Sequence, residues 1–377
     1  MGKKDPPQPA EPRDELIVDE VRPGRARIRK SDDDSVKMFE PVADGPLPID
    51  PPAAYVNNAS VAFSEHTNLT QAMVVHGYNE ISIVQWDPKL EKVKTNRFEV
   101  KNTQKNEVPV VLQARFVTPS SRNSPLIAVG STAGAFIYDS AGNRALLSFN
   151  PISAAFPKNQ DGRMEGFCRG VTCVENTIFM GTSTGAIMTF NCSGSTTVSI
   201  KKVINEHKYA IADMATCKFD ELTASADASG TVIVWTKGCK SANKKIAIDP
   251  RLDITVINVL RKQVLIGCVH GQVLIYAAMT GAHMASVAAH TRAVVGISVA
   301  PESAYVLTAS EDSSVRVFKL HTRKPEAYQL EFRYGDELDN NLLTGAHFAN
   351  DRGSSMVFAA FDVPNLLLYK IYKKPAV

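Results

Sequence analysis

Short apolar runs separated by turn residues fill most of this chain. From about residue 45 onward, apolar and polar positions alternate with a period of two, and glycine, asparagine, aspartate or serine stand between the runs. This alternation is typical of half-buried β-strands, and no stretch sustains the 3.6-residue period of an amphipathic helix. The sequence therefore predicts an all-β domain.

The predicted strands group into seven similar units. The clearest unit runs from Ala288 to Leu320, where a histidine is followed by an alternating strand, a turn and two further strands. Units recur about every 40–50 residues, the spacing of four-stranded propeller blades. Seven blades fit best, with six or eight as alternatives. The strands expected in the other units are 71–77 and 80–87; 110–117, 125–130 and 134–140; 169–174, 177–182 and 185–191; 211–216, 221–227 and 230–235; 253–260, 263–268 and 271–277; and 342–348, 355–361 and 365–372.

The last unit ends after its third strand, so closure of the ring requires an outer strand from elsewhere. An open ring would leave two bare sheet edges. We expect Gly45–Asp50 to supply the missing strand, because Pro46 and Pro48 are tolerated on an outer edge. On this basis residues 1–40 are predicted to be dispensable for folding, and residues 1–60 are not.

Residues 1–44 are predicted to form a disordered tail rich in proline and charge, ahead of a propeller at 45–377. A segment of this composition buries too little apolar surface to offset its ordering entropy. An acidic triplet at 32–34 directly follows a basic run. The run is a candidate docking element or nuclear signal, and a merely solvated tail is the alternative. Its residues are Arg22, Arg25, Arg27, Arg29 and Lys30.

Two units carry a histidine, a hydroxyl residue and an aspartate at similar spacing. They are His207, Thr223 and Asp227 with Trp235 in the fourth unit, and His290, Thr308 and Asp312 in the sixth, where Phe318 stands in place of tryptophan. With the stretches at 203–216, 271–283, 288–294, 307–312 and 344–348, and more weakly 72–77, these residues resemble the WD-repeat proteins. Within them, the chain is most similar to the family of WD repeat-containing protein 54, over residues 53–372.

The resemblance implies a seven-bladed WD-type β-propeller with an interaction role and no enzymatic activity to carry over. It also implies a buried chain of hydrogen bonds in each such unit, from the aspartate to the histidine, the hydroxyl and the indole N–H. The three residues after Asp227 lengthen the turn and are predicted to place its carboxylate out of register. Aromatic residues that recur once per unit are expected in the core: Trp86, Tyr138, Phe190, Trp235, Tyr276 and Phe318.

Composition adds little chemistry to this interpretation. The 377 residues carry a net charge of +3, and the phosphate-loop, nucleophile-elbow and zinc-protease motifs are absent. The six scattered cysteines contain one C-x4-C pair without a second pair, so we expect reduced thiols and no metal site. His76 and His270 have no partners near them in sequence, and His347, at an alternating strand position, is expected to pack in the core. We therefore predict no enzyme, no catalytic residues and no cofactor.

The most consistent function is a non-enzymatic scaffold that docks proteins or peptides on propeller loops. A candidate partner-binding rim of mixed charge flanks the two histidines: Lys208, Tyr209, Thr291, Arg292 and Glu311. The alternative is a structural subunit of a large ciliary or cytoskeletal assembly whose neighbours order the tail. No membrane insertion is expected, and no nucleic-acid binding, because basic residues are not interleaved with the aromatics. The expected location is the cytoplasm, with a cilium or the cytoskeleton as the alternative.

Overall fold

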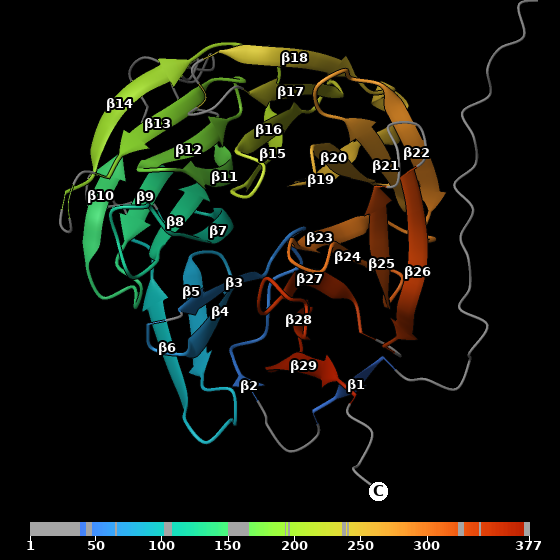
Figure 1. Ribbon diagram of the computed structural model, residues 1–377. Helices are drawn as coiled ribbons and strands as arrows, with labels where there is room; N and C mark the ends of the chain where they lie inside the picture. Colours follow the sequence, from blue (N-terminus) through green and yellow to red (C-terminus); the bar gives the residue numbers. More distant parts are fainter. Residues whose placement is uncertain are drawn as a thin grey trace, which may run out of the picture.

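Seven antiparallel sheets stand as blades around a central axis in the computed structural model (Figure 1). The structure describes residues 38–42, 47–64, 66–101, 108–149, 166–192, 194, 197–235, 239, 241–322, 328–338 and 341–372. The basic run Arg22–Lys30 and the tail up to residue 37 lie outside the described residues. The predicted seven-bladed propeller is confirmed.

Each blade takes four consecutive strands, ordered from the axis outward, except that the last blade borrows its outer edge. Blade one contains β3 (Ser60–Ser64), β4 (Leu69–His76), β5 (Glu80–Trp86) and β6 (Val93–Glu99). Blade two contains β7 (Val111–Val117), β8 (Leu126–Ser131), β9 (Gly134–Tyr138) and β10 (Ala145–Phe149). Blade three contains β11 (Cys168–Val174), β12 (Thr177–Thr182), β13 (Ile187–Asn191) and β14 (Ser199–Ile204). Blade four contains β15 (Ile211–Cys217), β16 (Leu222–Asp227), β17 (Thr231–Trp235) and β18 (Ala242–Ala247).

The remaining blades follow the same order. After the short 3-10 helix η2 (Pro250–Leu252), blade five contains β19 (Ile254–Leu260), β20 (Gln263–Cys268), β21 (Gln272–Ala277) and β22 (His283–Ala288). Blade six contains β23 (Val294–Ala300), β24 (Tyr305–Ser310), β25 (Ser314–Thr322) and β26 (Tyr328–Glu337). Blade seven contains β27 (Leu343–Phe348), β28 (Ser355–Ala360) and β29 (Asn365–Ile371), completed by β1 (Phe39–Pro41) and β2 (Leu47–Pro48).

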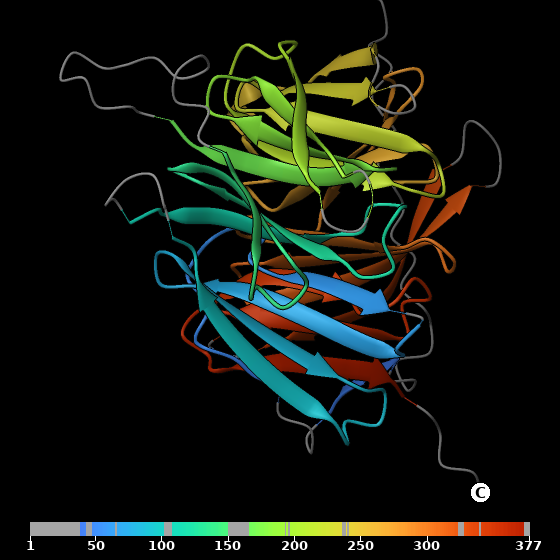
Figure 2. The ribbon, with the colours of Figure 1, turned by 90° about the vertical axis from the view of Figure 1, so that its left-hand side faces the viewer.

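The innermost strands all run the same way along the axis, which gives the ring two distinct faces. We call the face where innermost strands begin the start face, and the face where they end the end face. The loop before each innermost strand and the turn between second and third strands lie on the start face. The turn between first and second strands lies on the end face. Figure 2 shows the blades from the side, with strands running between the two faces.

The core is a ring of apolar layers, one at each blade boundary. Seven clusters of buried residues fill the seven boundaries. Second strands such as β8 and β16 are buried along their whole length, whereas the outer strand β14 is mostly exposed. This gradient arises because inner strands contact neighbouring blades on both sides. The recurring aromatics expected in the core are buried, except that Tyr276 is partly exposed.

Small residues near the end of the second strands let the blades approach closely. At Gly181 in β12, an added Cβ would lie 2.4 Å from the Cβ of Ile211 in the next blade. In other blades the equivalent position of the second strand carries alanine, where there is room for a Cβ. The members of this set are Gly130, Gly181, Ala226, Gly267, Ala309 and Ala359.

The N-terminal segment closes the ring through two short strands. β2 pairs with the beginning of β29, inside the predicted donor segment Gly45–Asp50. β1 pairs with the other end of β29, where Phe39 lies opposite Ile371. Phe39 is fully buried and meets Tyr334 of blade six edge to face, with ring centroids 5.2 Å apart. β1 therefore lies before the predicted tail boundary at residue 44. The dispensability of residues 1–40 for folding stays a prediction, and the buried Phe39 argues against it.

A connecting segment at 53–58 enters the middle of the start face before β3. The Asn58 amide donates to the carbonyls of Ala53 and Val75, and its own oxygen accepts the Val75 N–H. The Asn57 amide reaches Asp213 of blade four at 3.3 Å. These bonds tie the segment to blade one and to Asp213 of blade four.

Candidate functional site

A buried hydrogen-bonded set in blade four contains three of the four predicted WD residues. His207 donates from Nδ1 to Asp227 Oδ2 at 2.8 Å, and its Nε2 accepts from the Ser225 hydroxyl at 2.6 Å. Trp235 donates from Nε1 to the same Ser225 oxygen at 2.9 Å. The hydroxyl member is therefore Ser225, and the assignment to Thr223 was wrong.

Asp227 lies in register despite the longer turn that follows it. Its Oδ1 accepts the backbone N–H groups of Ser229 and Thr231 at 2.9 and 3.1 Å, together with the Ser229 hydroxyl at 2.6 Å. The three extra residues thus form the turn that the carboxylate caps. The predicted shift out of register was wrong, because those residues supply hydrogen-bond donors.

Thr223 belongs to a second chain of hydroxyl groups, closer to the end face. It lies 3.0 Å from the Thr216 hydroxyl, which accepts from Thr172 of blade three at 2.8 Å. Thr223 and Ser225 are two positions apart on one strand and share a face. The Ser225 hydroxyl therefore bonds within the WD set of blade four, whereas the Thr223 hydroxyl belongs to a chain that links blade four to blade three.

In blade six the aspartate reaches the histidine through an added serine. His290 Nε2 accepts from Thr308 Oγ1, and Nδ1 donates to Ser314 Oγ, both at 2.9 Å. The Ser314 hydroxyl donates to Asp312 at 2.6 Å. Burial lowers the pKa of His290 to about 4, although the nearby Asp312 opposes the shift. Since Phe318 offers no N–H, the set ends at Thr308.

The carboxyl group of Asp312 remains ionised deep into the acid range. Burial would raise its pKa, but hydrogen bonds from the Ser314 hydroxyl and the Thr291 N–H outweigh it and bring the pKa to about 2. The neutral imidazole and charged carboxylate hold one turn in place. Both sets are arranged as structural supports: each hydrogen-bonding side chain named in them has a partner within its own blade.

The five predicted rim residues lie on the start face, in two groups separated by blade five. Lys208 and Tyr209 precede β15, and Tyr209 is 58% exposed. Arg292 lies 3.5 Å from Glu311 across the loops of blade six. Thr291 instead bonds to Asp312 through its backbone N–H, at 2.8 Å. Thr291 therefore also stabilises the turn that contains Asp312, besides its predicted role in the rim.

The start face also presents exposed apolar side chains that the sequence did not single out. They occupy loops before innermost strands or turns after second strands in four blades, and Tyr209 adds a fifth. In the sequence, each of them is a large apolar residue next to a turn, at a position outside the alternating core pattern of a strand. Together with Tyr209, they are Tyr78, Val108, Val269 and Phe361.

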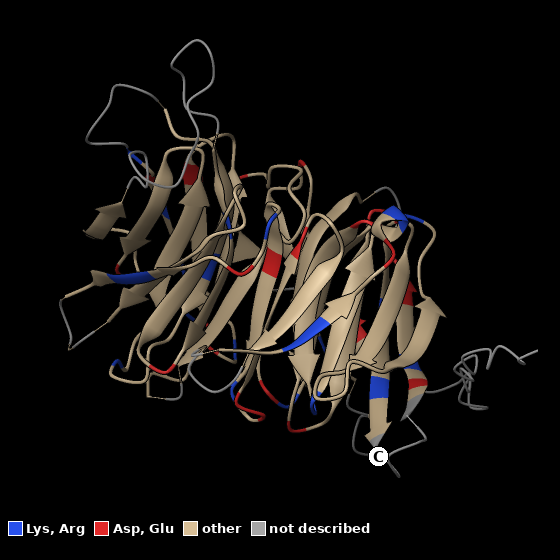
Figure 3. Ribbon diagram, turned by 90° about the horizontal axis from the view of Figure 1, so that it is seen from above, with Lys and Arg blue, Asp and Glu red and all other residues tan. Residues whose placement is uncertain are grey.

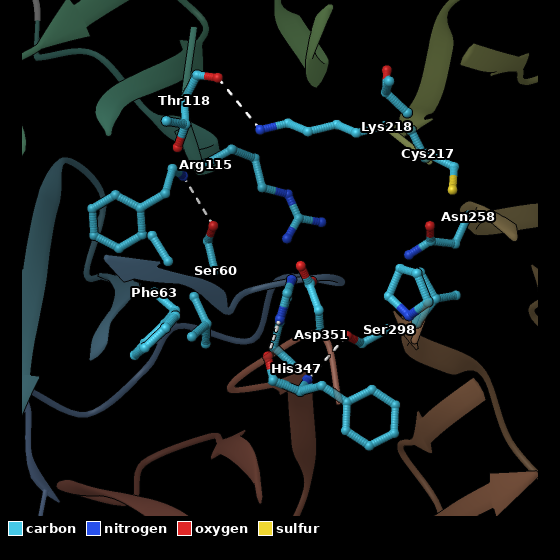
Figure 4. A pocket seen from close by; sticks show the side chains of 18 of the residues that line it. Ser60, Phe63, Arg115, Thr118, Cys217, Lys218, Asn258, Ser298, His347 and Asp351 are labelled. Carbon is cyan, nitrogen blue, oxygen red and sulfur yellow. Dashed lines mark hydrogen bonds between the residues drawn. The ribbon is translucent and has the colours of Figure 1, made fainter. Parts of the chain in front are cut away.

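The end face opens into a central funnel of about 1090 Å³, to which all seven blades contribute (Figure 4). Asp213 lies in its lining and accepts a hydrogen bond from the Asn57 amide. Arg115 of β7 and His347 of β27 line the wall. His347 was expected to pack in the core, but it forms part of this wall and donates from Nδ1 to the Phe348 carbonyl at 2.7 Å. Burial lowers its pKa to about 4, so the ring is neutral near pH 7.

Hydrogen bonds around the channel join every blade to the next. Most use a polar side chain of an innermost strand and a group on the following blade, at 2.8–3.0 Å. These side chains are thereby committed to the ring. In order, the bonds join Ser60 to Phe116 N, Gln113 to Gly170 N, Thr172 to Thr216, Asp213 to Ile257 N, Asn258 to Ile297 O, Ser298 to Phe348 N, and Asn58 N to Thr344 O.

The described part of the chain offers little support for a metal site or a reactive thiol. No group of three or more histidine, cysteine, aspartate or glutamate side chains is placed there to hold a metal ion. All six cysteines are buried and none forms a disulfide. Burial raises the pKa of Cys217, in the funnel lining, to about 11, which disfavours the reactive thiolate.

Comparisons with known proteins agree over almost the whole propeller. The family profile WDR54 matches residues 44–370. Mouse WD repeat-containing protein 54 is 25% identical over 325 residues, which cover 84% of this chain and 95% of the mouse protein. The human protein of the same name is 26% identical over 333 residues, covering 83% and 94%.

Solved structures show the same fold at low identity. A chain of the Mitotic Checkpoint Complex superposes with a TM-score of 0.63 at 16% identity, covering 99% of this chain and 98% of that one. The structure of U3-55K superposes with a TM-score of 0.61 at 13% identity, covering 89% and 98%. At these identities the likeness concerns the fold alone.

Proposed function

Because this chain belongs to the WDR54 family and folds as a seven-bladed propeller, we propose that it is a non-enzymatic scaffold that docks partner proteins on its start face. A propeller holds its loops on a rigid ring, and loops on rigid scaffolds commonly carry recognition. Its protein-interaction role is supported in general by the fold and the family. The face and the residues are our proposal.

The observation that carries the proposal is the exposed apolar set of the start face. Tyr78 is 70% exposed and Phe361 is 47% exposed, in blades one and seven. Tyr209 extends the set to blade four, beside Lys208, and the Arg292–Glu311 pair lies on the same face in blade six. Aromatic and arginine side chains among mixed charges match the composition of protein interfaces. Figure 3 shows acidic and basic residues interspersed over the ring, as expected for a protein partner rather than a polyanion.

Affinity capture with a triple variant tests the face directly. Tyr78→Ser, Tyr209→Ser and Phe361→Ser are combined in the tagged full chain, and retained proteins are quantified by mass spectrometry against wild type. We expect the amounts of the main partners retained to fall at least tenfold, since truncating one hot-spot aromatic costs about 2 kcal/mol or more, roughly thirtyfold in affinity.

The matched control carries Ile200→Ser and Val203→Ser on β14, at the outer edge of blade three. These residues are 44% and 46% exposed, so the control also removes exposed apolar surface, but away from the start face. The control is expected to retain the partners. If the start-face variant kept every partner of wild type while folding normally, the proposed face would be wrong.

The alternative of a ciliary or cytoskeletal assembly subunit depended on the tail. That segment lies outside the described residues, so no observation favours the alternative and we do not propose it. The docking role of Arg22–Lys30 and the cytoplasmic location likewise remain predictions. Among the described residues, no helix has the length and hydropathy needed to cross a membrane.

A further inference from the structure

Arg115 is a largely buried cation that faces the funnel on the end face. Figure 4 shows its guanidinium directed from β7 into the open centre. One of its nitrogens donates to the Ala59 carbonyl at 2.8 Å. None of the described carboxylates pairs with it within 4.0 Å. A buried guanidinium normally has a carboxylate or other anion as partner, because its desolvation is costly.

Asp213, the carboxylate whose charge raises the pKa of Arg115, is already engaged by neutral donors. Its oxygens accept from Asn57, from Gln113 and from the Ile257 N–H at 3.0–3.3 Å. Arg169 of the adjacent β11 adds a second positive charge, and its Nε has no hydrogen-bond partner. Burial lowers the pKa of both arginines, and the charge of Arg169 lowers that of Arg115 further. The channel centre therefore holds two cations for one carboxylate.

The other acidic groups of the funnel lie at its mouth and have partners of their own. Glu302 accepts from Arg352 at 3.1 Å, and Asp351 also has an interaction partner. Lys218 is an exposed cation at the mouth, where its ammonium lies 3.5 Å from the Thr118 carbonyl. An acidic group that enters thus passes Lys218 and reaches Arg115.

The size and rim of the funnel fit a segment of polypeptide better than a lone ion. A volume of about 1090 Å³ exceeds that of a small anion many times. The exposed rings of Phe63 and Phe219 stand at the mouth, on blades one and four. Apolar contacts at the rim with a cation at depth suit an acidic residue flanked by apolar ones.

We propose that the end-face funnel is a second binding site, which takes an aspartate or glutamate side chain of a partner protein and pairs its carboxylate with Arg115. The site lies on the face opposite the docking surface proposed above. Either assignment therefore stands or fails without the other.

A phage-displayed library of random heptapeptides, selected on the full chain, provides the probe. We expect selected peptides to be enriched in an acidic residue beside apolar ones. The strongest peptide is then labelled and its affinity measured by fluorescence anisotropy, for wild type and Arg115→Gln, with the acidic residue intact or changed to its amide. Each single change is expected to weaken binding about tenfold to hundredfold, and the two together little more than either alone.

Two further variants keep the test informative. Arg251→Gln removes an exposed arginine from η2, ahead of β19, and is expected to bind like wild type. Arg115→Lys keeps the cation if Arg115→Gln does not fold, and is expected to lose affinity at least threefold while preserving the preference for acidic peptides.

Three outcomes would overturn the proposal. One is a library that yields no binders, or binders without acidic enrichment. Another is an acidic preference that Arg115→Gln leaves unchanged. The third is a rise in melting temperature with inorganic phosphate, at constant ionic strength, that depends on Arg115 while no acidic peptide binds, which would assign the site to a free anion.

Discussion

Replacing Phe39 with alanine is expected to weaken the closure of the ring. The side chain is fully buried between blades six and seven. Phenylalanine-to-alanine changes in cores cost about 3–5 kcal/mol, the loss of apolar burial plus a cavity. For the roughly 335 residues from Met38 to Tyr372, an unfolding entropy of about 2.1 cal/mol/K per residue sums to about 0.7 kcal/mol/K. A loss of about 4 kcal/mol therefore lowers Tm by about 6 °C, which differential scanning calorimetry measures directly.

Phe219→Ala is the matched control, because the same ring is removed from a side chain that is 63% exposed. Its Tm is expected to stay within about 1 °C of wild type. Two truncations complete the test: a chain starting at Met38 should melt like wild type, and one starting at Asp44 should lose at least as much as Phe39→Ala. Equal melting temperatures for the two truncations would refute the role assigned to β1.

Three further predictions concern buried polar groups. Gln263→Leu is expected to raise Tm by about 1–4 °C, because both polar atoms of the Gln263 amide are buried without a partner. Leucine fits this place, since Leu222 takes the equivalent one in blade four. An unchanged or lower Tm would argue that the amide is satisfied. The pKa of His290 falls from 6.5 to about 4 on folding, so the unfolded state binds more protons between these two pH values. Stability is therefore expected to drop by about 3 kcal/mol as the pH falls from 6.5 to 4. In a plot of Tm against pH, His290→Asn should show a shallower slope than wild type. Ser225→Ala is expected to cost about 1–3 kcal/mol in urea unfolding, because the His207 imidazole and the Trp235 indole N–H both lose their partner.

Strand alternation and turn residues were sufficient to predict the ring. Every unit expected from the sequence corresponds to one blade, because each blade repeats the same buried second strand and short turns. The family resemblance drawn from a few motif strings is confirmed by the profile match over residues 44–370. Such repetition lets weak individual signals support each other.

Features that depend on contacts between blades were beyond the sequence pattern. β1 has three residues in a stretch rich in proline and charge, and only its pairing with β29 makes it a strand. Thr223 and Ser225 have the same parity, so alternation cannot tell which of them faces His207. Arg169 occupies the second position of β11, where β15 and β23 carry Ala212 and Val295, and the carboxylate that favours its charge, Asp213, lies on the next blade.

The pairing of β1 with β29 determines how the molecule can be attached to anything else. Tyr372 donates its N–H to the Met38 carbonyl at 3.0 Å, so both ends of the described propeller emerge at one corner of the end face. A bead, fluorophore or fused domain joined at either end would occupy the same side of the ring. Immobilised in this way, the protein would present its start face outward, and a binding assay would sample the two faces unequally. Attachment through β14 instead, on the outer edge, would leave both faces accessible.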